Sequence, residues 1–241
     1  MSDSEDDCNE KRLNVAVLGE QNVGKTNLIK RFCHDDFSRI YVPTIGADFY
    51  IKRVTLSRTK DVIVRIADVS GLEMNGHMVS TYLFKTNIIL LVYDITNMES
   101  FNSLNVWLKK INEIMNRYTE EENPTIAVMG NKCDLEHKRA MRLHVINQFA
   151  QENNLTNFSV SAKTGEKVNS SFIELIAAFF SIVLSDLEKD KEKSIIKAEL
   201  ISRTPQPIKQ DSKRVSGKRK QSKLKNVVTK RKLNNQSCTI Q

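Results

Sequence analysis

The sequence lacks the features that mark secreted and membrane-spanning proteins. Its four cysteines lie far apart and form neither a disulfide framework nor the close pairs of a zinc site. No apolar run approaches the roughly 18 residues of a membrane-spanning helix, and the acidic start MSDSEDDCNE has no apolar signal-peptide core. We therefore expect a protein of the reducing cytosol.

Glycine is also scarce, with eight in 241 residues. Most of the glycines stand beside polar or charged residues between predicted elements, at positions 19, 24, 46, 71, 130 and 165. A chain with so little glycine uses it where the backbone must come close to a ligand. The segments around these glycines are therefore candidate binding loops.

A net positive charge is absent from most of the chain and is concentrated in its last part. Residues 202–241 hold 12 Lys and Arg and one acid, whereas residues 1–201 have a net charge of −3. The tail has few large apolar residues and no periodicity, so we expect it to be disordered. The predicted organisation has four segments: an acidic, disordered start at 1–11, a folded domain at 12–187, a helical extension at 188–201 and a basic tail at 202–241.

Hydrophobic patterning predicts alternating strands and helices. Short apolar or alternating runs predict strands at 13–18, 47–56, 61–67, 87–93, 125–129 and 157–160. Helical periodicity is clearest at 25–34, 100–117 with Thr96 or Asn97 as its cap, 143–152 and 170–187. The prediction is a three-layer α/β domain with five helices and a six-stranded, mostly parallel sheet that has one antiparallel edge strand.

The segment GEQNVGKT matches the phosphate-binding pattern G-x-x-x-x-G-K-[ST] and lies between a predicted strand and a predicted helix. In such a P-loop, backbone N–H groups surround phosphates and the helix N-terminus adds partial positive charge. Lys25 is expected to reach the terminal phosphates, and the Thr26 hydroxyl to bind Mg²⁺. The predicted phosphate-binding residues are Gly19, Glu20, Gln21, Asn22, Val23, Gly24, Lys25, Thr26 and Asn27.

A second pair of motifs predicts the base. Asn131-Lys132-Cys133-Asp134 follows a predicted strand, and a carboxylate at Asp134 can accept hydrogen bonds from both N1–H and N2–H₂ of guanine. Adenine offers no such pair of donors, and a buried unsatisfied carboxylate is costly, so discrimination should be steep. Ser161-Ala162-Lys163 ends the next strand and is expected to complete the guanine pocket.

Taken in order, GEQNVGKT, PTIGADF, the AD-x-x-G core, NKCD and SAK resemble the Ras superfamily of small GTPases. TIGADF and YDITNMESF are most similar to the Rab branch, and the similarity covers residues 12–187. The MSDSE start, the altered AD-x-x-G segment and the CaaX-like end resemble an atypical, prenylated Rab subgroup linked to cilia. The resemblance implies the three-layer G-domain fold and GTPase activity, GTP to GDP and phosphate.

The resemblance also implies roles for the residues between the motifs. Phe37 would stack on the guanine, and Tyr41 would close over the phosphates. Thr44 would join Thr26 in binding Mg²⁺, and Asp68 would hold the metal through water. We name the segment around Thr44 switch I and the segment around Gly71 switch II.

The switches link the nucleotide to binding partners in this family. The Gly71 N–H would contact the γ-phosphate, so that loss of this phosphate would release both switches. The implied partners are effectors that bind the GTP form through the two switches, a guanine nucleotide exchange factor, a prenyltransferase and a prenyl-binding chaperone.

Switch II departs from the family pattern at the residue that matters for hydrolysis. Typical Rabs have WDTAGQE where this chain has ADVSGLE, so Leu72 replaces the glutamine that orients the attacking water. Leucine can neither donate nor accept a hydrogen bond. Gln21 also occupies a position where small residues favour fast hydrolysis. Lys25 and Gly71 remain as catalytic residues, and Glu73 is a possible partial substitute, so we expect intact binding and slow hydrolysis.

The tail ends in Cys238-Thr239-Ile240-Gln241, a CaaX pattern whose final Gln favours farnesylation of Cys238. One prenyl chain anchors only marginally, and basic residues near an anionic leaflet add about 1 kcal/mol each. We expect the protein on the cytoplasmic face of a plasma, endosomal or ciliary membrane and partly in the cytosol. GKRK and TKRK are also compatible with nuclear or RNA-binding patches, but the tail has no aromatic residue to stack on a base, so no specific nucleic acid is expected.

The predicted function is a membrane-associated small GTPase of Rab type that binds GTP, GDP and Mg²⁺ and acts as a switch in vesicle or membrane trafficking. The alternative is a scaffold that holds GTP constitutively and hydrolyses it negligibly. Leu72 favours the alternative, whereas the complete set of binding loops fits both.

Overall fold

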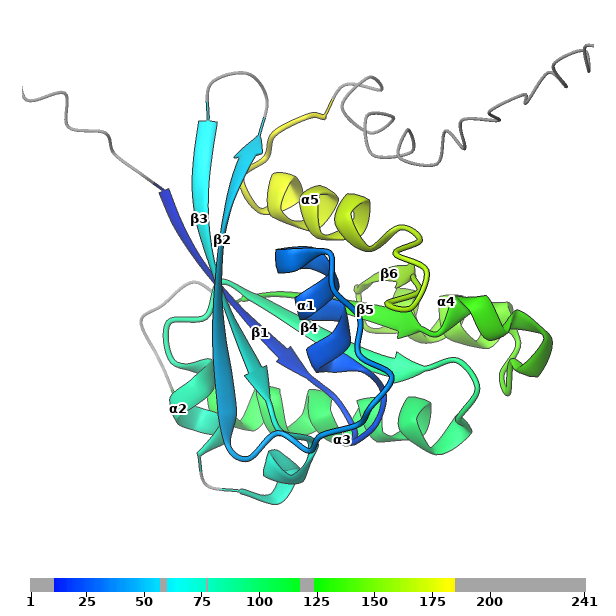
Figure 1. The fold of residues 1–241 in the computed structure, drawn as a ribbon. Helices are drawn as coiled ribbons and strands as arrows, with labels where there is room; N and C mark the ends of the chain where they lie inside the picture. Colours follow the sequence, from blue (N-terminus) through cyan, green and yellow to red (C-terminus); the bar gives the residue numbers. More distant parts are fainter. Residues whose placement is uncertain (1–10, 57–59, 77, 118–123, 185–241) are drawn as a thin grey trace, which may run out of the picture. The chain divides into compact units, whose positions relative to one another are not determined.

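The computed structural model describes residues 11–56, 60–76, 78–117 and 124–184. At its centre is a six-stranded sheet in the order β2-β3-β1-β4-β5-β6 (Figure 1). The strands are β1 (Lys11–Leu18), β2 (Ala47–Leu56), β3 (Lys60–Val69), β4 (Ile88–Asp94), β5 (Thr125–Asn131) and β6 (Thr156–Ser159). Only β2, at one edge, is antiparallel to its neighbour, and the other pairs in the described sheet are parallel. The predicted sheet is confirmed.

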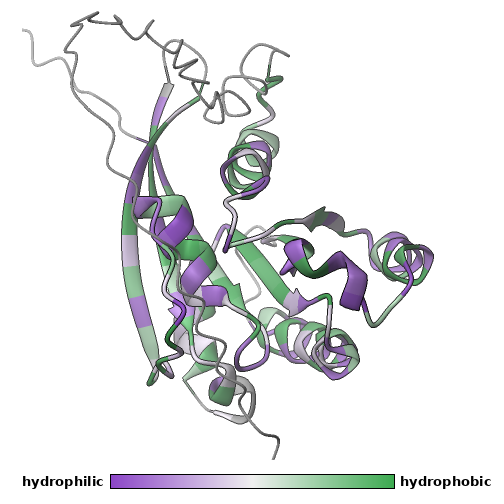
Figure 2. Ribbon diagram, turned by 45° about the vertical axis from the view of Figure 1, so that its right-hand side comes forward, coloured by the Kyte–Doolittle hydropathy of each residue, from purple (hydrophilic) through white to green (hydrophobic). Residues whose placement is uncertain are grey.

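Helices cover both faces of the sheet and make it the middle of three layers. They are α1 (Lys25–His34), α2 (Val79–Leu83), α3 (Met98–Met115), α4 (Leu143–Glu152) and α5 (Val168–Phe179). Helices α1 and α5 enclose one core with the sheet, and α2, α3 and α4 enclose a second core on its other face. Figure 2 shows hydrophobic strands between these helical layers. The predicted α/β fold with five helices is therefore confirmed for the described residues.

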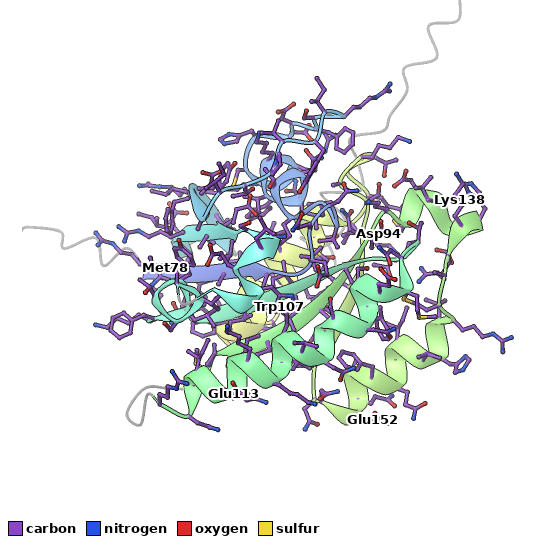
Figure 3. The ribbon with its side chains drawn as sticks, turned by 90° about the horizontal axis from the view of Figure 1, so that it is seen from below. Met78, Asp94, Trp107, Glu113, Lys138 and Glu152 are labelled. Atoms are coloured by element: carbon purple, nitrogen blue, oxygen red, sulfur yellow. The ribbon has the colours of Figure 1, made fainter. Side chains whose placement is uncertain are left out.

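The two cores explain why β4 consists almost entirely of apolar residues. Ile88, Leu90 and Val92 point into the core with α1 and α5, whereas the alternate residues Ile89 and Leu91 point into the core with α3. A parallel strand that is covered on both faces has no polar side. In the second core, Trp107 of α3 is fully buried (Figure 3), which agrees with a packing role.

The last helix is shorter than its sequence pattern predicts. We expected it to reach residue 187, but α5 ends at Phe179. Ser181 adopts a left-handed conformation with φ 53°. The Ile182 N–H donates to Ala177 O at 2.8 Å and the Ser181 N–H to Ala178 O at 3.0 Å. This bond pattern is a Schellman motif, which closes a helix end whatever apolar residues follow.

Several elements lie outside the periodic patterns or outside the described part of the chain. Helix α2 and the 3₁₀ helices η2 (Gly71–Asn75) and η3 (Cys133–Lys138) have only five or six residues each, too few to show a period. The predicted extension at 188–201, the basic tail and Cys238 lie outside the described residues, so the proposed domain limits stay predictions. No described helix is long and apolar enough to cross a membrane.

Candidate nucleotide-binding site

A pocket of about 320 Å³ lies where the loops after β1, β3, β5 and β6 meet the loop between α1 and β2. Its predicted lining residues are Gln21, Asn22, Gly24, Lys25, Thr26, Asn27, Phe37, Tyr41, Thr44, Gly71, Leu72, Asn131, Lys132, Asp134, Ala162 and Lys163. The pocket is also lined by residues that sequence reasoning missed, namely Lys30, Ser38, Arg39, Ile40, Val42, Pro43, Ser70 and Leu135. Ligands of parallel sheets bind at this edge, outside the carboxyl ends of the strands.

Five of the predicted residues do not line the pocket, but each of them makes a hydrogen bond to a residue that does. They are Gly19, Glu20, Val23, Asp68 and Ser161, which bond to Lys25, Thr26, Asn131 or Asp134 of the lining. The P-loop, switch I, switch II and the two base motifs are thus brought together.

The P-loop holds the amino group of Lys25 at the start of α1. Its Nζ donates to the carbonyl oxygens of Gly19 at 2.9 Å and Glu20 at 2.8 Å. Burial lowers the pKa of Lys25 to about 8, although Asp68 and Glu20 raise it in part. Gly19 has φ +139°, and a Cβ there would overlap the Val92 carbonyl, so only glycine lets the loop turn against β4.

Three predicted metal ligands form one corner of the pocket. The Thr26 hydroxyl lies 2.5 Å from Asp68 Oδ2, and the Thr44 hydroxyl lies 3.4 Å from the same oxygen. Asp68 is fully buried, its Oδ1 has no hydrogen-bond partner, and burial raises its pKa. No group of three or more His, Cys, Asp or Glu among the described residues could hold a metal. Hard oxygen donors and an unpartnered carboxylate oxygen fit Mg²⁺, which prefers such ligands.

At the other end of the pocket, Asp134 is held in one orientation. Its Oδ1 accepts a hydrogen bond from the Ser161 hydroxyl at 2.7 Å, and its Oδ2 lies 3.5 Å from Lys163 Nζ. The Ser161 hydroxyl in turn accepts from the Thr164 N–H at 3.1 Å. Asp134 is 12% exposed and can still accept hydrogen bonds from a ligand in the pocket.

Asn131 ties the phosphate end of the pocket to the base end. Its side-chain Nδ2 donates to Val23 O at 2.8 Å, and its Oδ1 accepts from the Ala162 N–H at 3.0 Å. Asn131 is 2% exposed, and these bonds use both ends of its amide. Its geometry supports a role in joining the P-loop to the Ser161-Ala162-Lys163 loop.

Lys132 is held between the P-loop and the end of β4. It donates to Asn22 O at 2.9 Å and pairs with the Asp94 carboxylate at 2.6 Å. Sequence reasoning missed Asp94, although its place at the carboxyl end of the apolar run NIILLVY was a usable signal. The backbone of Lys132 has φ 68°, a left-handed conformation.

Switch I is anchored at its start and exposed beyond it. Asn27 of α1 donates to Ser38 O at 2.9 Å and accepts from the Ser38 N–H at 3.2 Å. Phe37 is partly buried against the core, whereas Tyr41 is 54% exposed and Ile45 is 93% exposed. An exposed apolar stretch at the pocket mouth is available to a ligand or to a partner.

Switch II lies against the P-loop. A Cβ on Gly71 would come within 2.5 Å of Gln21 N, so this close approach requires glycine. Ser70, which sequence reasoning missed, accepts from the Leu72 N–H at 3.3 Å and donates its own N–H to Gly46 O at 2.9 Å. Leu72 is the second residue of η2, and its apolar side chain is 66% exposed.

These loops on a three-layer α/β fold define a P-loop nucleotide-binding domain. The Ras family model matches residues 14–181, and the chain belongs to this family. It is 33% identical over 205 residues to Ras-related protein Rab-28 of Caenorhabditis elegans, covering 85% of this chain and 82% of that protein. It is also 33% identical to Ras-related protein Rab-1C of Dictyostelium discoideum, over 68% of this chain and 78% of that protein. To Ras-related protein Rab-10 of Diplobatis ommata it is 36% identical, over 67% of this chain and 78% of that protein.

The family assignment confirms the predicted Ras superfamily membership and its Rab branch. Proteins of this family bind guanine nucleotides, typically with Mg²⁺, hydrolyse GTP and act as switches. The roles of individual residues in this chain follow as proposals.

Proposed function

We propose that this chain is a Rab-type switch in vesicle or membrane trafficking that binds GTP and GDP with Mg²⁺ and hydrolyses GTP slowly. The observation that carries the proposal is the fixed placement of Asp134 and Lys25 at opposite ends of one pocket. Asn131 joins the loops that carry these two groups.

The base end of the pocket supports selection of guanine. The Ser161 hydroxyl fixes one oxygen of Asp134 and leaves the carboxylate able to accept from the N1–H and N2–H₂ edge of guanine. A base without both donors leaves a largely buried charge unsatisfied, which costs more than the hydrogen bond itself gains. Phe37 supplies an apolar wall for the base, and Lys163 Nζ lies 3.5 Å from Asp134 Oδ2.

The phosphate end combines backbone N–H groups of residues 19–24, the helix N-terminus of α1 and the Lys25 ammonium. Thr26, Thr44 and Asp68 would hold Mg²⁺, which neutralises phosphate charge when bound. Thr44 belongs to switch I, and the Gly71 N–H belongs to switch II. Contacts of both with a γ-phosphate would order the two switches, and loss of the phosphate would release them.

Slow hydrolysis follows from Leu72. An exposed leucine cannot align a water molecule, and alignment is the main task left to the protein in phosphoryl transfer. Lys25 and Gly71 still stabilise charge on the phosphates. The same observation favours the second candidate function, a scaffold that keeps GTP and binds effectors through the exposed switch surface without a useful hydrolytic cycle.

Membrane attachment through Cys238 is the last part of the proposal. Its support is the CaaX pattern together with the excess of Lys and Arg in residues 202–241. A prenyltransferase and a prenyl-binding chaperone are the partners that such a tail requires, and an exchange factor would reload the domain with GTP. The proposed location is the cytoplasmic face of a membrane, with a cytosolic fraction.

Asp134→Asn tests base selection by exchanging one acceptor oxygen for an amide donor, which suits xanthine better than guanine. In competition binding with the full chain, GTP affinity should fall by about 100-fold or more, and XTP affinity should rise. Asp35→Asn, the same change at an exposed carboxylate, should leave both affinities unchanged. Equal loss of GTP and XTP would show that Asp134 acts only on the fold.

A further inference from the structure

Arg31, near the end of α1, fastens this helix to the loop that carries the base pocket. Its Nε donates to Ala162 O at 3.0 Å, and its Nη2 donates to Lys163 O at 3.1 Å. Its Nη1 donates to the carbonyl oxygen of Asp35 at 2.9 Å and to the Asp35 carboxylate at 2.8 Å. All three guanidinium nitrogens are thus used, and the side chain is only 18% exposed.

The loop at residues 161–166 packs against this side chain. Gly165, with φ +81°, lies so close that a Cβ there would be 3.6 Å from Arg31 Cδ. The Gly165 N–H donates to Ser161 O at 2.9 Å, and the Ser161 N–H donates to Glu166 O at 3.1 Å. The loop therefore presents two carbonyl oxygens to Arg31, while its Ser161 hydroxyl holds Asp134.

Arg31 links the base loop to the phosphate loop through a rigid element. It stands six residues after Lys25 on the same helix, which is about 9 Å along the helix axis. The planar guanidinium can reach two carbonyls at once, and an ammonium cannot reproduce this fork. The ion pair with Asp35 contributes little, because that carboxylate is 88% exposed.

We propose that Arg31 is a positioning residue for guanine recognition. By holding the carbonyls of Ala162 and Lys163, it keeps Ser161 and Asp134 in register with the P-loop. It thereby slows release of the nucleotide and sharpens selection of guanine over hypoxanthine, which lacks the N2–H₂ donor. This inference rests on the proposed function of the same pocket.

The test uses the full chain loaded with Mg²⁺ and GDP, and compares Arg31→Gln with Arg65→Gln, an exposed arginine on β3. Release of GDP should be about tenfold faster in Arg31→Gln, and the ratio of GDP to IDP affinity should fall about fivefold or more. The factor by which EDTA accelerates release should match the unchanged protein, because the Thr26–Asp68 corner is untouched. Asp35→Asn and Arg65→Gln should leave all three quantities within about twofold.

A lower melting temperature of Arg31→Gln with an unchanged GDP-to-IDP ratio would overturn the inference, because it would show a purely structural role. If Arg31→Gln does not fold, Arg31→Lys decides, since it keeps the charge and loses one carbonyl bond. Its release rate should lie above that of the unchanged protein, and an equal rate would overturn the inference. Failure of the unchanged chain to bind GDP would instead refute the proposed function itself.

Discussion

Lys25 is a buried amino group whose charge depends on what surrounds it. Burial lowers its pKa to about 8, because the charged form loses hydration. Phosphate groups next to Nζ would favour the charged form and raise this pKa again. Nucleotide binding above pH 8 must therefore take up a proton, and the affinity must depend on pH.

We expect GDP affinity to be nearly constant below about pH 7.5 and to fall between pH 8 and 9, by at most tenfold per pH unit. Titration calorimetry in buffers of different ionisation enthalpy measures the proton uptake directly. The measurement stops near pH 9, where guanine itself begins to lose a proton. Lys25→Arg, which does not titrate in this range, should show no such slope if it still binds. A flat affinity from pH 7.5 to 9 in the unchanged protein would contradict the lowered pKa.

The motif residues of the site could be predicted because their chemistry lies in their side chains. Lys25 and Asp134 are recognisable from residue type and spacing, and the structure brings them into one pocket. Arg31 and Ser70 could not be found in this way, and the signal for Asp94 was only its place at the end of an apolar run. Arg31 and Ser70 act largely on backbone groups, which every residue carries, and Asp94 meets Lys132 only through the fold.

The length of a helix or strand decided whether hydrophobic periodicity could predict it. Strands such as β4 and helices such as α3 carry enough residues to show a period. Helix α2 and the two 3₁₀ helices are too short. The end of α5 was wrongly predicted because its apolar pattern continues, whereas a left-handed Ser181 ends the helix. A backbone conformation at a single serine leaves no trace in hydrophobic periodicity.

Helix α3 offers a test of a predicted cap. Asn97 was one of two candidates, and its Oδ1 accepts from the Glu99 N–H at 2.8 Å. Asn97→Ala should lower the free energy of unfolding by about 1 kcal/mol, since it leaves a helix donor unsatisfied. Asn102→Ala, an exposed site within the same helix, should be neutral or slightly stabilising. Equal effects of both changes in urea unfolding would refute the cap.

At the scale of the whole molecule, the chain combines an acidic start, a nearly neutral domain at 12–187 with a net charge of +1, and a strongly basic tail. In the proposed function, the domain binds the nucleotide and the tail attaches the protein to a membrane. Electrostatic attraction weakens as ionic strength rises, whereas burial of a prenyl chain does not. The two contributions to membrane binding can therefore be separated by salt.

Cys238→Ser should move the protein from membranes to the soluble fraction in cells, as measured by fractionation at low and high salt. Replacing the lysines and arginines of residues 213–232 by glutamine should release only part of it and should make the remainder insensitive to salt. Cys8→Ser, the same change in the acidic start of the chain, should leave the distribution unaltered. Retention of Cys238→Ser on membranes at high salt would contradict lipid attachment.

In the proposed function, this pocket binds GTP but hydrolyses it slowly, because Leu72 stands where typical Rabs have glutamine. The most direct measurement is single-turnover phosphate release from full-length protein preloaded with GTP, for the unchanged chain and for Leu72→Gln. Restoring an amide that can align water should raise the rate by about tenfold or more, which is about 1.4 kcal/mol of the barrier, while GTP affinity stays the same. Equal rates in the two proteins would contradict the claim. Glu73→Ala would then show whether Glu73 already supplies the alignment, in which case the rate falls further.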